Sequence, residues 1–207
     1  LPDAGDDGER RGEPGVLSVD GPEAARRAAF GALAERWDEG KSPEAIASGV
    51  LRGLSLLGEL DGLRVVDLGA GPGRLEPFLL PRLGGGRVVA VDYAPEMVVR
   101  GAVSIRDARV TWLCRAVADA GLPAGAFDLV LCFDAFPHFP DPASVIGEAR
   151  RWLVPAGRLL VWHDVGRTRL AEVHRRAGRA VERDLLPPVE ELAGTAHRAG
   201  FEVERAE

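Results

Sequence analysis

Apolar runs and segments of helical periodicity alternate along most of the chain. Each apolar run is hydrophobic almost throughout rather than at every second position, which is typical of strands buried on both faces. Helix-like segments bounded by Gly or Pro separate the runs. The pattern predicts an α/β fold, a doubly wound, mostly parallel sheet with helices on both faces. The predicted strands are residues 64–68, 87–92, 110–114, 127–133 and 158–163.

Helical segments flank this region on both sides. Apolar residues recur at spacings of three and four between residues 22 and 60, which predicts two helices. Ser42 as N-cap and Pro43 at the first helical position mark the start of the second helix. Beyond the last apolar run we expect helices near 167–183 and 188–199 and a final strand over 201–207.

The 207 residues fit one domain with small additions. Residues 1–22 are rich in Gly, Pro and Asp and hold few apolar side chains, which predicts a flexible N-terminal arm. Residues 23–60 form the N-terminal helices, and residues 61–207 form the main α/β domain.

Composition narrows the class of protein further. Hydrophobic residues make up 46% and charged residues 28%, as in an ordinary globular protein. The net charge of -6 disfavours nucleic acid as a partner, and no apolar run approaches the roughly 18 residues of an integral membrane segment. Cys114 and Cys132 lack CxxC spacing, which indicates neither a disulfide framework nor a zinc cluster and favours a cytoplasmic protein.

A glycine-rich loop carries the strongest chemical signal. The segment VVDLGAGPGR, residues 65–74, follows the first predicted strand and precedes a helix expected over residues 74–83. A dinucleotide fingerprint would need glycine where the chain has Arg74. Asp67 just before the loop would repel a pyrophosphate but would attract an ammonium group. The loop therefore suits a zwitterionic ligand better than a diphosphate.

The second predicted strand ends in another acid. Asp92, at the tip of that strand, is placed to accept hydrogen bonds from both hydroxyls of a ribose. Tyr93 and Met97 follow it and can cover the faces of a flat base. A zwitterionic nucleoside and a dinucleotide both contain a ribose, so this position does not separate the two ligand classes.

With these motifs in order, the sequence resembles the class I S-adenosylmethionine-dependent methyltransferases, in particular the small-molecule group of ubiquinone and menaquinone biosynthesis C-methyltransferases. The resemblance covers about residues 30–205. It implies a Rossmann-like methyltransferase fold and transfer of a methyl group from S-adenosylmethionine to a small-molecule acceptor, with S-adenosylhomocysteine as product. The matching segments are VVDLGAGPG, VVAVDYAPEM, GAFDLVLCFDAFPHFPDP and RRWLVPAGRLLVW.

The resemblance also implies which residues hold the cofactor. Asp67 and the loop from Gly69 to Gly73 would face its methionine part, and Asp92 would hold its ribose. Trp37 matches an aromatic position in an N-terminal helix that closes over the cofactor. The full set is Trp37, Asp67, Gly69, Ala70, Gly71, Gly73, Asp92, Tyr93, Met97, Asp119, Phe133 and Asp134.

The chain departs from the family pattern at several points. The acid that contacts the adenine amine usually stands four residues before a Leu-Pro pair, where this chain has Ala118. We expect Asp119, one position later, to take that role. The family's LHH-type loop reads FPH at residues 136–138. The family ends in an antiparallel hairpin, whereas this chain stops at the first of its two strands, so the final antiparallel strand is expected to be missing.

Histidines near the ends of the fourth and fifth predicted strands are the candidate catalytic residues. His138 and His163 can each act as a general base if the acceptor arrives protonated. His174 lies on an apolar helix face and is interpreted as a core residue, and His197 on the last helix is interpreted as structural or solvated. A three-histidine metal site is disfavoured, and no metal is expected.

Two other functions stay open at this point. One is a nicotinamide-dependent oxidoreductase on the same type of sheet, disfavoured by Arg74 and Asp67. The other is a non-catalytic module that binds S-adenosylmethionine. The acceptor and the methylated atom are not specified by the sequence, and the chain is expected to be a monomer or homodimer.

Overall fold

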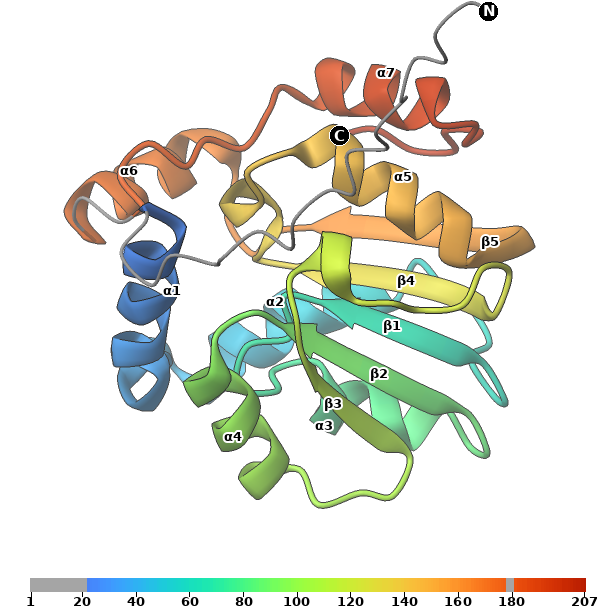
Figure 1. Ribbon diagram of the computed structural model, residues 1–207, viewed down its shortest axis with the longest axis horizontal. Coiled ribbons are helices and arrows are strands. Elements are labelled where there is room, and N and C mark those ends of the chain that lie inside the picture. Colours follow the sequence, from blue (N-terminus) through green and yellow to red (C-terminus); the bar gives the residue numbers. More distant parts are fainter. Residues whose placement is uncertain (1–21, 178–180) are drawn as a thin grey trace, which may run out of the picture.

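A five-stranded sheet forms the centre of the computed structural model, which describes residues 22–177 and 181–207 (Figure 1). The strand order is β3-β2-β1-β4-β5, and every neighbouring pair is parallel. The order reverses between β1 and β4, which is where open α/β sheets bind their ligands. The predicted doubly wound parallel sheet is therefore confirmed. The strands are β1 Arg64–Leu68, β2 Arg87–Asp92, β3 Val110–Cys114, β4 Phe127–Phe133 and β5 Leu153–Trp162.

One face of the sheet is covered by helices from the first half of the chain. They are α2 Pro43–Leu54, α3 Glu76–Leu79 with the 3-10 turn Leu80–Arg82, and α4 Pro95–Ser104. Leu54 of α2 and Leu79 of α3 are fully buried against Val65 and Leu129 of the sheet. Val65 of β1 and Leu129 of β4 are partners in register, so their side chains point to the same face and form one apolar layer with these helices.

The other face is covered by helices from the second half, α5 Pro142–Trp152 and α7 Val189–Arg198 (Figure 1). Trp152 and Ile146 of α5 pack in one buried cluster with Val66, Val130 and Cys132 of the strands. The strand side chains next to those of the first layer thus point to this second layer. Burial on both faces explains why the strands read as continuous apolar runs.

Two more helices lie beyond one end of the sheet, α1 Pro22–Leu33 with the 3-10 turn Ala34–Arg36, and α6 Arg167–Ala177 (Figure 1). This is the end at which the strands finish, because Arg26 of α1 donates a hydrogen bond to the backbone oxygen of His138, just after β4. Two short turns follow strands at the same end, the 3-10 turns Val117–Asp119 and Phe136–His138. The N-terminal segment therefore borders the ligand-binding edge.

Helix starts agree with the sequence pattern. The Ser42 hydroxyl accepts a hydrogen bond from the backbone N–H of Ala45 at 3.2 Å, which confirms the predicted N-cap of α2. The Asp141 carboxylate accepts hydrogen bonds from the backbone N–H groups of Ala143 and Ser144 and so caps α5. Each cap satisfies backbone donors that a helix start leaves without partners.

Three predicted elements differ from the structure. The helix expected over residues 74–83 is only α3 and a 3-10 turn, because Pro81 has no N–H to donate to the preceding turn. The strand β5 starts at Leu153, five residues before the predicted start at 158. The strand predicted over 201–207 is wrong. Gly200, with φ of +89°, and the Phe201 N–H bond to Ala196 close α7, and the residues after them lack regular structure.

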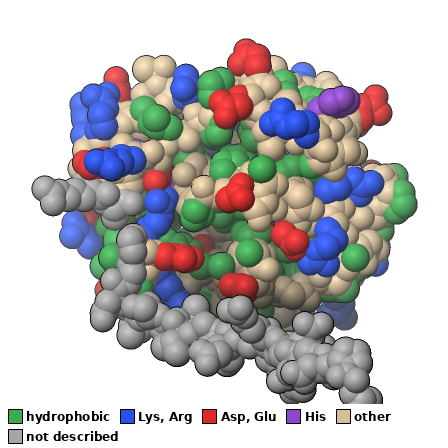
Figure 2. Space-filling model, turned by 45° about the horizontal axis from the view of Figure 1, so that its top comes forward, with side chains coloured by type: hydrophobic (Ala, Val, Ile, Leu, Met, Phe, Trp, Pro, Cys, Tyr) green, Lys and Arg blue, Asp and Glu red, His purple; other side chains and the backbone are tan. Residues whose placement is uncertain are grey.

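The flexible arm predicted for residues 1–22 lies outside the described residues, except for Pro22 at the start of α1. Among the described helices, none is both long enough and apolar enough to cross a membrane. On the face shown in Figure 2, acidic, basic and apolar side chains are mixed.

Candidate active site

The loop after β1 turns so sharply that it requires glycine. Gly69, Gly71 and Gly73 have φ values of +70°, +56° and +93°, in the left-handed region that other residues rarely adopt. A Cβ on Gly69 would lie 2.3 Å from the Cβ of Ala135, which follows β4. The loop therefore sits tightly against the end of the neighbouring strand.

Asp92, the last residue of β2, holds this loop in place. Its Oδ2 accepts a hydrogen bond from the backbone N–H of Gly71, and its Oδ1 accepts one from the backbone N–H of Ala94, each at 2.9 Å. Burial raises the pKa of Asp92, and these backbone donors oppose that rise. Each carboxylate oxygen can accept a second hydrogen bond. Asp92 can therefore shape the loop and also bind a ligand hydroxyl.

A pair of buried carboxyl groups lies beneath the loop. Asp67 in β1 and Glu76 at the start of α3 are 1% and 0% exposed. Burial raises the pKa of Glu76 to about 7. Burial, and then repulsion from Glu76, raises the pKa of Asp67 well above its usual value. With both groups ionised, Asp67 Oδ2 and both Glu76 oxygens have no hydrogen-bond donor in the part of the chain that the structure describes, which favours a pair that holds a proton.

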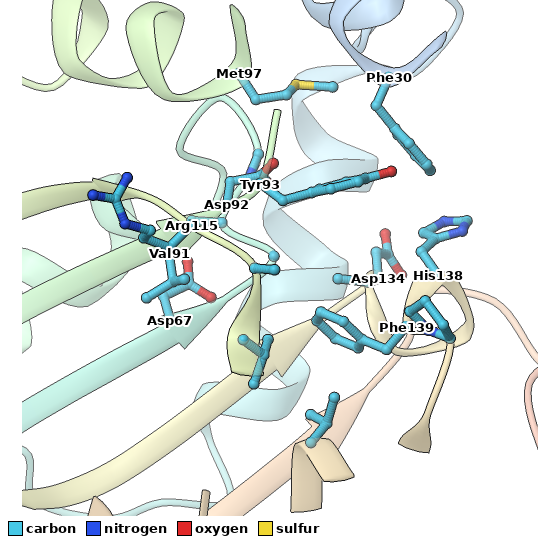
Figure 3. A pocket seen from close by; sticks show the side chains of 18 of the residues that line it. Phe30, Asp67, Val91, Asp92, Tyr93, Met97, Arg115, Asp134, His138 and Phe139 are labelled. Carbon is cyan, nitrogen blue, oxygen red and sulfur yellow. The ribbon is translucent and has the colours of Figure 1, made fainter. Parts of the chain in front are cut away.

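A cavity of about 270 Å³ opens beside the loop, between the ends of β1, β2 and β4 and helix α1 (Figure 3). Acids from two strands reach it, Asp67 and Asp92, together with Asp134 after β4. Much of the remaining wall is apolar or aromatic. The other lining residues include Phe30, Trp37, Gly69, Ala70, Gly71, Tyr93, Met97, Ala118, Phe133, His138 and Phe139.

Three aromatic side chains form one wall of the cavity. The ring centroid of Phe30 in α1 lies 6.0 Å from that of Trp37 and 5.9 Å from that of Tyr93. In Figure 3 the Tyr93 ring extends toward Phe30 and His138. The buried Tyr93 hydroxyl has no hydrogen-bond partner within residues 22–177 and 181–207, and burial raises the pKa of Tyr93 to about 12. The wall thus offers flat apolar surface and one neutral hydroxyl.

Asp134 anchors a charged cluster on another side. Among the described residues it is the one non-glycine residue with positive φ, at 54°. Its Oδ1 accepts a hydrogen bond from the backbone N–H of Asp164 at 2.9 Å, and its Oδ2 lies 3.6 Å from Lys41 and 3.7 Å from Arg74. Arg74 also donates to Asp38. The arginine that breaks the dinucleotide fingerprint thus connects the loop to Asp38, beyond the 3-10 turn Ala34–Arg36, and to Asp134, just after β4.

His138 borders the cavity with a carboxylate behind it. Its Nδ1 lies 2.7 Å from Oδ2 of Asp184, and Arg26 of α1 contacts the same carboxylate. Burial lowers the pKa of His138, although Asp184 opposes that change. The imidazole is therefore neutral near pH 7 and has one ring nitrogen free of the carboxylate.

Most residues that the sequence assigned to a cofactor line the cavity. This placement brings together residues from four segments far apart in sequence, as a shared ligand would require. They are Trp37, Asp67, Gly69, Ala70, Gly71, Asp92, Tyr93, Met97, Phe133 and Asp134.

Three assigned residues do not line it. Gly73 turns the loop behind the cavity, where a Cβ would meet Ile105 and Trp112 at 3.1 Å. Asp119 is exposed at the end of its 3-10 turn, and Ala118 lines the cavity in its place, so the contact expected of Asp119 stays a prediction. His163 is 5% exposed with Nδ1 3.6 Å from Asp134, and burial lowers its pKa to about 4. Of the two candidate bases, His138 is the one at the cavity.

Sequence reasoning missed several residues of the site. Phe30 and Phe139 looked like ordinary core residues. Glu76 carried one weak signal, a charged residue inside an otherwise apolar stretch just after the glycine loop. Asp184 carried none, because only the folded chain brings it to His138 from 46 residues away.

Comparison with known proteins agrees with this geometry. Residues 66–161 match the family model described as Methyltransferase domain. The ubiquinone biosynthesis O-methyltransferase of Xanthomonas oryzae pv. oryzae is 36% identical over 141 residues, which cover 64% of this chain and 57% of the relative. The enzyme of the same name from Xanthomonas euvesicatoria is 34% identical over 139 residues, with the same two coverages.

Solved structures share the fold. A chain in the complex of the Haloferax volcanii Trm112 methyltransferase activator with a methyltransferase has a TM-score of 0.74 at 22% identity and covers 85% of this chain and 77% of its own. A SAM-dependent methyltransferase from Aquifex aeolicus has a TM-score of 0.67 at 21% identity, with coverages of 84% and 90%.

The cavity lies at the switch point of the parallel sheet, where open α/β folds bind their ligands. Over residues 66–161 the chain is similar in sequence to methyltransferases, and its fold is similar to that of S-adenosylmethionine-dependent methyltransferases. It spans 57% of the length of the curated relatives named above. Those relatives methylate oxygen by name, whereas the sequence resemblance was to carbon-methylating enzymes of quinone biosynthesis.

Proposed function

We propose that the chain transfers a methyl group from S-adenosylmethionine to a hydroxyl oxygen of a small, largely apolar molecule and releases S-adenosylhomocysteine. The observation that carries this proposal is the buried Asp67 carboxyl at the glycine loop, whose Oδ2 has no hydrogen-bond donor among the described residues. A ligand with an ammonium group would supply that donor, and a pyrophosphate would not. The name of the curated relatives supports oxygen as the methylated atom.

The residues present fit this methyl donor. Gly71 leaves open space above the loop, since a Cβ there would lie 3.9 Å from Nε1 of Trp37, the nearest atom from the other described residues apart from its chain neighbours. Asp67 would hold the ammonium group and Asp92 the ribose hydroxyls. Tyr93 and Met97 would cover the base. When bound, S-adenosylmethionine supplies a methyl group made electrophilic by a positively charged sulfur.

The protein's own part in the reaction is to position, to exclude water and to accept a proton. Phe30, Trp37 and Phe139 line the cavity with apolar surface that suits an aromatic ring. His138 is neutral near pH 7 and can accept the proton of a hydroxyl. Holding the acceptor in line with the methyl group would supply most of the rate enhancement.

The remaining properties are proposals of the same kind. The acceptor is a small molecule, since the acidic chain has no general attraction for nucleic acid. Cys114 and Cys132 are free thiols, which suits the cytoplasm. A monomer or homodimer is expected, and light scattering on the purified protein would measure it.

Labelled methyl transfer tests the proposal. The purified chain would be incubated with methyl-labelled S-adenosylmethionine and matched acceptors that offer a phenol, an aniline or a thiophenol. The expected result is label on the phenol oxygen, lost in Asp92→Ala. Transfer to the aniline or thiophenol alone would contradict oxygen as the acceptor. Binding of the donor without transfer to any of them would contradict the proposed reaction.

A further inference from the structure

Asp184 joins three segments behind two residues of the cavity wall, His138 and Arg26. It lies between α6 and α7, outside residues 66–161, which match the methyltransferase family. Its carboxylate contacts Nδ1 of His138 at 2.7 Å and also the guanidinium of Arg26 in α1. Asp184 is 8% exposed, so this contact is shielded from bulk water. A short hydrogen bond to a buried carboxylate holds an imidazole in one orientation.

This contact decides which nitrogen of His138 carries the proton. A carboxylate accepts hydrogen bonds only, so Nδ1 must be the donor and Nε2 keeps its lone pair. Phe30 fixes the ring from another side, with 4.9 Å between the two centroids. The neutral ring next to the cavity therefore presents a proton acceptor.

The charged and titratable groups around His138 come from several elements. Asp184 and Arg26 meet at its Nδ1 side. The ring of His174 in α6 lies 4.9 Å from that of His138, and its own Nδ1 contacts the backbone oxygen of Asp184. Asp184 is the one anion among these groups and is thus the group that can stabilise a positive charge on His138.

We propose that Asp184 is a positioning residue that holds His138 as the general base for an acceptor with an ionisable hydroxyl, such as a phenol. This inference rests on the proposed methyl transfer. The hydroxyl proton passes to Nε2 of His138 while the oxygen forms a bond to the methyl carbon. The bond from that carbon to sulfur breaks, its electron pair stays on sulfur, and Asp184 stabilises the imidazolium that results.

The first test needs no acceptor. Nitrogen NMR of the histidine rings in the full chain, alone and saturated with S-adenosylhomocysteine, reports the tautomer and pKa of His138. We expect the Nδ1–H tautomer in the wild type. Asp184→Asn removes the anion, so the pKa of His138 should fall by about one unit or more. Asp107→Asn is the matched control, because it removes a carboxylate that Arg109 contacts on the α4–β3 connection, away from the cavity.

The second test uses two phenols as acceptors. Unsubstituted phenol keeps its proton at neutral pH, whereas an acidic nitrophenol arrives largely as the anion. Asp184→Asn and His138→Gln should each lower kcat for phenol by about 100-fold and change kcat for the nitrophenol much less. The acidic limb of the pH profile for phenol should also move to lower pH in Asp184→Asn, which a merely structural role would not cause.

Each outcome has a defined meaning. An unchanged tautomer and pKa of His138 in Asp184→Asn would overturn the positioning role. Equal losses of kcat for both phenols would show that Asp184 does not act through proton transfer to His138, and would overturn that part of the proposal. A chain that binds S-adenosylhomocysteine but methylates neither phenol would overturn the acceptor class. Failure to bind S-adenosylhomocysteine would instead refute the proposed function. The positioning role of Asp184 would still be tested, because the ring measurement on the chain alone reports on it. If Asp184→Asn unfolds, His138→Gln gives the comparison of the two phenols.

Discussion

Replacing Glu76 by glutamine should change how the stability of the protein depends on pH. Glu76 is fully buried beside Asp67, and no donor among the residues that the structure describes satisfies its carboxylate. Burial raises its pKa from 4.5 to about 7 in the folded chain. Glutamine has a similar shape, stays neutral at every pH and can donate a hydrogen bond to Asp67.

The direction and the size of the effect follow from the pKa of Glu76. Because the folded pKa lies above the unfolded one, the folded state binds more protons between 4.5 and about 7. Stabilisation by the protonated group is complete below pH 4.5 and is lost as the pH rises to about 7. A pKa difference of this size corresponds to about 3 kcal/mol. The free energy of unfolding of Glu76→Gln should therefore exceed that of the wild type by the largest amount at alkaline pH.

Urea unfolding followed by circular dichroism measures this difference. Between about pH 5 and about pH 8, the free energy of unfolding of Glu76→Gln relative to the wild type should rise by about 2–3 kcal/mol. Glu148→Gln serves as the control, since Glu148 is a partly exposed member of an ion pair with Arg151. Its difference from the wild type should stay within about 0.5 kcal/mol across the range. A constant difference for Glu76→Gln would refute the shared proton.

Three further substitutions test other parts of the account. Gly69→Ala forces a side chain into a left-handed backbone and against Ala135, so thermal unfolding should show a loss of about 1–3 kcal/mol, and an unchanged midpoint would contradict the strained loop. Asp92→Asn removes the carboxylate that can accept hydrogen bonds from the ribose hydroxyls. Calorimetry should therefore show S-adenosylhomocysteine bound at least about tenfold more weakly. Ser42→Ala deletes the N-cap of α2 and should cost about 1 kcal/mol of stability in urea while the affinity for S-adenosylhomocysteine stays the same.

The fold could be predicted because its signals are local. Continuous apolar runs indicate strands buried on both faces, and the order of strands and helices then leaves a doubly wound sheet. Ser42 predicts the start of α2 locally, because the backbone N–H that it caps lies three residues further along the chain. The prediction failed at 201–207, where alternating residues suggested a strand. A strand also needs a neighbour to pair with, and no local pattern reports that neighbour.

The cavity was predictable to the extent that strand ends define it. Asp67 and Asp92 lie at the carboxyl ends of two predicted strands. Parallel strands end at one edge of the sheet, so the sequence places the two acids at the same edge. Asp119 shows the limit, because a one-residue shift in a 3-10 turn decides whether a side chain faces the cavity or solvent. Glu76 and Asp184 depend on contacts between distant segments, which spacing along the chain does not encode.

Direct binding of the methyl donor tests the central claim. Calorimetric titrations of the purified chain with S-adenosylmethionine, S-adenosylhomocysteine, NADH and NADPH, repeated with Asp92→Ala, compare the two ligand classes at one site. The account predicts that the first two bind with micromolar affinity, that Asp92→Ala weakens both, and that neither nicotinamide nucleotide binds. Binding of NADH or NADPH in place of S-adenosylmethionine would contradict it.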